Sequence, residues 1–375
     1  MKLFSFPYLI QKEIIDHLSI NQLVYLSLCS KNVNKFIKQT RMYQLKQVER
    51  ITYKTGNTYK AIYLRMANER YDSSLMYLFK SPEDFQEFKS YGPVQEVRVN
   101  ELGAPIDFRY CLTMDPNPHG EYSPDTLDSI IKSIHRQLYD LLGNDTKFWL
   151  ESVDYSTEQG AHFLPTLHNI QKAEVFGKCL ESSKIDDFLD RSTCLEYFSF
   201  GTHREQPAIE LRENSKLYDL DTVYVCTFFD ACFMANDVLK RFNGRHAFLR
   251  GREIDISNVI QFLKKWKSGE KYKNLELISV ECRFNLPRIR KSAKVKEINR
   301  EVKYSFIRRF GEANTDFFHL VSGEFASRLY MVRESDGHVA SVMLTRDLVM
   351  MGVWNMTEKE FLTKFNLPNE DAALL

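Results

Sequence analysis

Short apolar segments that read as β-strands recur about every 23–30 residues between residues 147 and 281. They are, in order, KFWLESV, KAEVFG, LEYFSF, TVYVCT, HAFLRG and LELISV. Helical stripes lie between several of them, and two of these stripes end at Gly244 and Gly269. Parallel strands need long connections, and glycine commonly ends a helix. The pattern therefore predicts parallel strands that are joined by crossover helices.

This spacing is typical of a solenoid in which each repeat adds one strand and one helix. The strict leucine-rich-repeat consensus is absent, so an ordinary α/β domain with a parallel sheet is the alternative. In either case LEYFSF, TVYVCT, HAFLRG and LELISV should lie side by side in chain order. Right-handed crossovers place their helices on one face, which leaves the opposite face open. Leu263 and Trp266 should then be buried between their helix and the sheet.

The first 45 residues carry a helical pattern instead. Ile10, Ile14 and Leu18 recur at intervals of four, which forms one apolar helical face. Pro7 suits the start of this helix, because proline lacks the amide proton that a first turn leaves unpaired. Two further stripes follow, so the sequence predicts a block of three short helices.

The apolar surface of this block exceeds what three short helices can bury among themselves. Its second helix has Leu23, Leu26 and Cys29 on one side and Val24 and Leu28 on the other, so it is apolar nearly all round. Either the rest of the chain covers the surplus or a partner protein does. Exposure of Leu18, Leu23 and Leu26 would favour a partner.

The residue order of the block resembles an F-box. The resemblance rests on Phe6-Pro7-Tyr8-Leu9-Ile10, then Ile14-Ile15-Asp16-His17-Leu18, then Leu23, Leu26, Ser27 and Cys29-Ser30-Lys31. Phe6 replaces the usual Leu before the proline, and the common Trp after the Ser-Lys pair is missing. The resemblance implies docking on the Skp-type adaptor, and through it a cullin, of a ubiquitin ligase. The residues expected at that contact are Pro7, Leu9, Ile10, Ile14, Leu18, Leu23, Leu26 and Cys29.

Two later segments resemble the type 2 F-box-associated region of the large nematode-type F-box family. They are NVIQFLKKWKSGEKYKNLELISVE and LYMVRESDGHVASVMLTRDLVMMGVW, whose closing hairpin turns at Ser335-Asp336-Gly337. The expected layout is an F-box over residues 1–45, a β-rich connecting segment over 46–122 and a repeat-like substrate-recognition domain over 123–375. The predicted fold is thus mixed α/β: a small three-helix F-box, then a leucine-rich-repeat-like βα solenoid or parallel-sheet domain with a C-terminal β-hairpin.

Composition narrows the classes of partner. The 51 basic and 50 acidic residues give a net charge of +1, which does not indicate a nucleic-acid partner. Seven cysteines without a CxxC pair favour a reduced compartment, cytoplasmic or nuclear, over a disulfide framework. No stretch approaches the roughly 18 apolar residues of a membrane span, so no membrane partner is expected.

Catalytic signatures are absent from the sequence. There is no GxSxG, GxxxxGK[ST], GxGxxG or HExxH motif, so no cofactor is expected. His162 and His168 lack a third residue at zinc-ligand spacing. Cys226 and Cys232 lie in an apolar run, where buried inert thiols are expected. An enzyme with an unrecognised site is the least favoured class.

The segment from Arg283 to Arg309 holds ten basic residues against Glu297 and Glu301. A solvated connector is the favoured interpretation, and a face that binds an acidic degron is the alternative. No aromatic ladder or RNA-binding signature interleaves the charges, so a nucleic acid is not favoured.

The function that these features favour is a non-catalytic substrate receptor of a Skp–cullin–F-box type ubiquitin ligase. Its C-terminal domain would recruit a client protein of unknown identity. A repeat-type protein-interaction scaffold that assembles no ligase is the alternative.

Overall fold

The computed structural model divides the chain into two compact units. It describes residues 3–56, 59–79, 94–99, 106–111, 119–154, 164–177, 181–202, 210–227, 234–252, 254–284, 286–306, 323–365 and 373–374. The first unit comprises Met1–Ser156, His162–Ala173 and Ser192–Cys194, and the second comprises the remainder. The boundaries expected at residues 45 and 122 both lie inside the first unit. No described helix is long and apolar enough to cross a membrane.

The described residues of the first unit form strands in the spatial order β4-β5-β6-β3-β2-β1-β7. Their bounds are β1 (Val48–Thr55), β2 (Tyr59–Met66), β3 (Ser73–Phe79), β4 (Val94–Val99), β5 (Ile106–Cys111), β6 (His119–Glu121) and β7 (Lys147–Asp154). The β3–β6 and β1–β7 pairs are parallel, and the other pairs are antiparallel. β1 and β2 flank Gly56 as an antiparallel hairpin.

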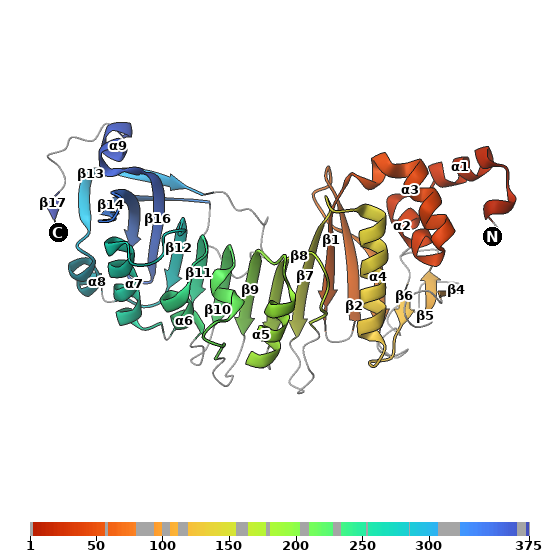
Figure 1. Ribbon diagram of the computed structural model, residues 1–375, viewed down its shortest axis with the longest axis horizontal. Coiled ribbons are helices and arrows are strands. Elements are labelled where there is room, and N and C mark those ends of the chain that lie inside the picture. Colours follow the sequence, from red (N-terminus) through yellow and green to blue (C-terminus); the bar gives the residue numbers. More distant parts are fainter. Residues whose placement is uncertain are drawn as a thin grey trace. The chain divides into compact units, whose positions relative to one another are not determined.

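The described part of the first unit also holds the helices α1 to α4 (Figure 1). They are α1 (Tyr8–Asp16), α2 (Ile20–Cys29), α3 (Lys31–Leu45) and α4 (Leu127–Leu142), and the short 3-10 helix η1 (Leu3–Ser5) precedes them. α4 ends at Gly143, whose φ of 84° lies in the region that favours glycine.

A buried histidine joins α4 to the sheet. His135 Nδ1 lies 2.9 Å from the Tyr53 hydroxyl of β1, and its Nε2 lies 2.7 Å from the carbonyl oxygen of His168. Nε2 must therefore donate, so Nδ1 accepts the hydrogen bond from the tyrosine. Burial lowers the pKa of His135 to about 4, since the charged form would lose its hydration.

The second unit begins with four parallel strands in chain order. β9 (Tyr197–Thr202), β10 (Thr222–Thr227), β11 (His246–Arg250) and β12 (Leu277–Glu281) pair consecutively. The order and direction predicted for these four strands are confirmed. β8 (Ile170–Gly177) precedes them, and the division between the units falls after its residue Ala173. The leucine-rich-repeat solenoid itself stays a prediction.

α5, α6 and α7 of the second unit follow the predicted alternation, and α8 and α9 lie beyond the predicted repeats. Their bounds are α5 (Ser182–Arg191), α6 (Met234–Arg241), α7 (Ile256–Ser268), α8 (Leu286–Ala293) and α9 (Glu358–Lys364), and the link between β9 and β10 contains the 3-10 helix η3 (Lys216–Asp219). α6 and α7 lie side by side on one face of the parallel strands (Figure 1). Leu263 and Trp266 of α7 are fully buried, as predicted.

The face of β9 and β10 opposite to the helices is not open, contrary to expectation. Tyr197, Tyr224 and Cys226 form a buried cluster on these strands, and the partly buried Phe248 of β11 packs against it. The Tyr224 and Phe248 rings stack with their centroids 5.8 Å apart. Aromatic side chains at alternate positions on adjacent strands bury one another, which accounts for the closed face.

An antiparallel half completes this sheet. β12 pairs with β16 (Leu348–Thr357), and the order continues through β15 (His338–Leu344), β14 (Glu324–Val332), β13 (Lys296–Ser305) and β17 (Ala373–Leu374). β14 and β15 flank the turn that contains Ser335-Asp336-Gly337, so the C-terminal hairpin is confirmed.

The basic segment is not a solvated connector, so that expectation was wrong. Its described residues include all of α8 and all of β13, which pairs with β14. Ile289 of α8 is buried, as are Ile298 and Val302 of β13. These apolar side chains hold the segment in the fold while its charges face solvent. Residues 307–309 lie outside the described residues.

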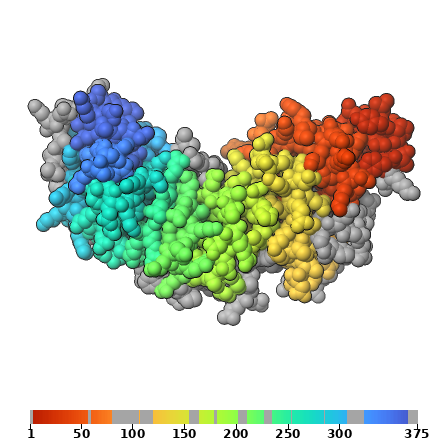
Figure 2. Space-filling view, in the orientation of Figure 1, coloured from red at the N-terminus to blue at the C-terminus, as the bar shows by residue number. Residues whose placement is uncertain are grey.

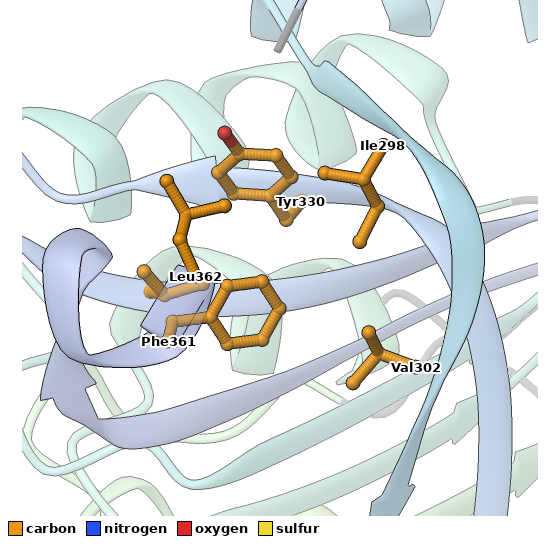
Figure 3. Packing of buried hydrophobic residues seen from close by; sticks show 6 residues of the cluster. Ile298, Val302, Tyr330, Phe361 and Leu362 are labelled. Atoms are coloured by element: carbon orange, nitrogen blue, oxygen red, sulfur yellow. The ribbon is translucent and has the colours of Figure 1, made fainter. Parts of the chain in front are cut away.

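α9 closes a second core over the antiparallel strands. Ile298, Val302 and Tyr330 from the strands pack with Phe361 and Leu362 of α9 (Figure 3). The Tyr330 hydroxyl donates a 2.8 Å hydrogen bond to the Glu358 carboxylate at the start of α9. The hairpin and the basic segment therefore belong to one packed structure.

Candidate adaptor-binding site

α1 leaves most of its side chains in solvent. Of its nine residues, all of them described, only Ile15 is buried. Large apolar side chains on α1 and just before it are 41–74% exposed, and we refer to this set as the N-terminal apolar patch: Phe4, Phe6, Tyr8, Leu9 and Ile10. In the first unit, α1 lies on the far side of α2 and α3 from α4 (Figures 1 and 2). Monomeric proteins rarely expose such a cluster unless it binds something.

α3 packs against the N-terminal apolar patch. The Phe36 ring of α3 meets the rings of Phe4 and Tyr8 edge to face, with centroids 6.0 Å apart in each pair. At the other end of α1, Arg41 donates a 2.8 Å hydrogen bond to the carbonyl oxygen of Asp16 and lies 3.2 Å from its carboxylate. α1 is thus anchored at both ends by α3 while its outer face stays open.

α2 lies in the interior. Ser19 caps it, since its hydroxyl accepts from the Gln22 amide while the Gln22 side chain accepts from the Ser19 amide. The Asn21 side chain donates a 3.0 Å hydrogen bond to the carbonyl oxygen of Ser74 in β3. Leu23, Val24 and Leu28 are fully buried. The rest of the chain therefore covers the surplus apolar surface of α2, as one of the two sequence interpretations expects.

The residues expected at an adaptor contact fall into three groups. Pro7, Leu9 and Ile10 are exposed. Four others are partly buried: Ile14, Leu18, Leu26 and Cys29. Leu23 is 0% exposed, so this residue does not show the exposure that would favour a partner. A helix that is apolar on all sides is buried on all sides. Leu23 accordingly faces the core of the first unit.

Sequence reasoning missed part of the patch. Phe4, Phe6 and Tyr8 were not among the expected contacts, although Phe6 and Tyr8 lie beside the expected Pro7. A signal was present, because these three aromatic residues alternate around Pro7 and do not continue the four-residue stripe of the following helix. Such residues do not belong to the apolar stripe by which that helix packs.

The candidates for chemistry do not assemble into a site within the described residues. No group of three or more His, Cys, Asp or Glu side chains that could hold a metal ion occurs there. The predicted burial of Cys226 is confirmed. His162 and Cys232 lie outside the described residues.

Residues 3–45 match the family model of the F-box domain. This match covers α1, α2 and α3 and supports an F-box protein. F-box domains bind Skp-type adaptors in cullin complexes, and such a domain in general implies a substrate-recognition subunit of this ligase class. No curated protein and no solved structure was found to match the chain.

Proposed function

We propose that the chain is the substrate-recognition subunit of a Skp–cullin–F-box type ubiquitin ligase and that it binds the adaptor through the N-terminal apolar patch. One observation carries the proposal: the segment that matches an F-box presents a cluster of large apolar side chains that its own fold does not cover. The adaptor would cover them.

Burial of this patch supplies the driving force for binding. Each large apolar side chain that becomes fully buried contributes about 1.5–3 kcal/mol. Leu9 and Ile10 are 74% and 46% exposed, so both have apolar area left to bury. Association and the ordering of side chains cost several kcal/mol, so a few such residues are needed rather than one. The five members of the patch meet that requirement.

The rest of the chain would recruit a client protein. F-box proteins are typically non-catalytic subunits. The chain would then contribute proximity between a client and the transferring subunits. The type 2 F-box-associated region, the nematode-type family and an intracellular location belong to this proposal, and their support is the sequence pattern.

A double substitution on α1 tests the proposal. Leu9→Asp with Ile10→Asp places two carboxylates in the expected interface, where their desolvation opposes binding. Calorimetry against a Skp-type adaptor should show binding to the natural chain and none to this variant. Because Leu9 and Ile10 are exposed, the variant should keep the thermal stability of the natural protein.

Tyr71→Asp is the matched control. Tyr71 is 75% exposed in the same unit but lies between β2 and β3, outside the F-box match. It should bind the adaptor normally. Unchanged adaptor affinity in the α1 double variant contradicts the proposal. If the natural chain binds no adaptor at all, the scaffold alternative is favoured instead.

A further inference from the structure

We propose that the groove between α3 and α4 binds an acidic peptide segment, one that carries carboxylates or phosphates. The groove lies in the first unit, where α4 runs beside α2 and α3 (Figures 1 and 2). Its volume is about 540 Å³, within the usual range for ligand sites. The inference stands on its own observations and does not depend on the proposed adaptor contact.

Cations dominate the walls of the groove. α3 contributes Lys31, Lys35 and Lys38, and α4 contributes Arg136 and the single carboxylate of Asp140. Lys38 Nζ lies 2.9 Å from Asp140 Oδ1, so these two charges offset each other. Within the part of the chain that the structure describes, the other three cations have no acidic partner. An anion in the groove would meet a local surplus of positive charge.

An amide in the groove adds an uncharged hydrogen-bonding group to these cations. Asn34 lines the groove between Lys31 and Lys35 and is 7% exposed. Its side chain makes no hydrogen bond to any described residue. Because the amide lines the groove and makes no such bond, it is available to a molecule that enters the groove. A ligand oxygen that accepts a hydrogen bond from the Asn34 amide would complete this site.

The spacing of the lysines suits an extended peptide. Lys31, Lys35 and Lys38 share one face of α3, and the rise from the first to the last is about 10 Å at 1.5 Å per residue. In an extended chain, alternate side chains are separated by roughly 7 Å. A segment of three to five residues with alternate acidic side chains would therefore face these three cations.

The same features favour a peptide over a nucleic acid. The cations are confined to one short groove, and no aromatic side chain lines it on which a base could stack. Nucleic-acid binding faces carry longer basic stripes, and the chain as a whole has a net charge of only +1.

The test measures the binding of two fluorescent peptides to the full chain by anisotropy at low salt. One probe is Gly-Asp-Gly-Asp-Gly-Asp, and the other has phosphoserine in place of each aspartate. The double variant Lys35→Gln/Arg136→Gln should weaken binding at least tenfold. Asp140→Asn should strengthen it severalfold, because that change removes the competing carboxylate and frees Lys38. Asn34→Leu should weaken it as well.

The double variant Lys12→Gln/Lys46→Gln is the control. It removes the same total charge at exposed lysines of the first unit outside the groove. It should bind both probes like the natural chain. The difference between the two probes shows whether carboxylates or phosphates are preferred.

Three results overturn the proposal. The first is the absence of binding to the natural chain. The second is an equal loss in the control and in the groove variant, which would indicate a general charge effect. The third is a single-stranded oligonucleotide of equal charge that binds more tightly than either peptide and loses affinity in the groove variant. That result would assign the groove to a nucleic acid.

Discussion

The turn between β14 and β15 holds a buried arginine in place through one carboxylate. The side chain of Arg333 is 6% exposed. Its Nε lies 2.9 Å from Asp336 Oδ1, and its Nη2 lies 2.7 Å from Oδ2. The guanidinium carbon lies 5.4 Å from the centre of the Trp266 ring of α7. Asp336 therefore compensates a cation that connects the hairpin to the helical layer.

Asp336→Asn keeps the shape of the side chain and removes its charge. Removal of one partner of a fully buried pair costs about 3–5 kcal/mol. Asp336 is 37% exposed, so water screens part of the interaction. We expect a loss of about 2–3 kcal/mol in the free energy of unfolding at pH 7 after this discount.

The effect should depend on pH in a defined direction. The bonds from Arg333 hold the pKa of Asp336 well below its usual range. The stabilisation from this carboxylate is therefore fully present above its ordinary pKa of about 4 and is lost as the pH falls below that value. The asparagine variant lacks this titration, so its deficit relative to the natural protein should shrink in acid.

Urea denaturation at pH 7 and at pH 3, followed by tryptophan fluorescence, measures both quantities. Asp347→Asn is the control, because Asp347 is an exposed carboxylate in the neighbouring turn between β15 and β16. It should change the stability by less than about 0.5 kcal/mol. A similarly small change for Asp336→Asn at pH 7, or an equal deficit at both pH values, would refute the reasoning.

Two further predictions concern the cores. Trp266→Ala should destabilise the second unit by about 3–5 kcal/mol in thermal or urea unfolding, because the side chain is fully buried. Trp266→Phe should cost less, since the buried indole Nε1 has no hydrogen-bond partner among the described residues to lose. For His135, whose pKa is lowered to about 4, stability should fall by about 2–3 kcal/mol between pH 6.5 and pH 4, because the unfolded chain takes up the proton first. A pH series on His135→Gln should lack that component, and an identical profile would show that another group is responsible.

The parallel half of the second unit was predictable because its signals are local. Gly269 ends α7 in the left-handed conformation, and the buried Leu263 and Trp266 lie on one helical face. A helix that ends at glycine before an apolar strand specifies a crossover without reference to distant parts of the chain. Two such units, followed by Gly244 and Gly269, lie between β10 and β12, and the regular strand spacing extends the order to β9.

The antiparallel half depends on pairing across long sequence distances. β12 (Leu277–Glu281) pairs with β16 (Leu348–Thr357), although α8 and the strands β13, β14 and β15 lie between them in the chain. No local sequence pattern predicts this strand pairing. The basic segment was misread for a related reason: its charges are dense, and the buried residues Ile289 and Ile298 are too widely spaced to read as one stripe.

The sequence predicts that the N-terminal three-helix block has more apolar surface than it can bury, but it does not predict which helix exposes that surface. α2 is apolar on all sides and is buried because other elements of the first unit pack around it, with Asn21 bonded to β3. α1 has the narrower stripe, and yet it exposes Leu9 and Ile10. Where neighbouring elements are available, they cover the most apolar helix first, because it gains the most from burial. The helix that stays exposed, α1, is the one whose apolar face costs only a moderate free energy in water. A docking surface must remain soluble before its partner binds and must still bind that partner, so it needs a moderately apolar face. A moderately apolar helical stripe beside exposed aromatic residues therefore indicates a docking face better than the most apolar helix does.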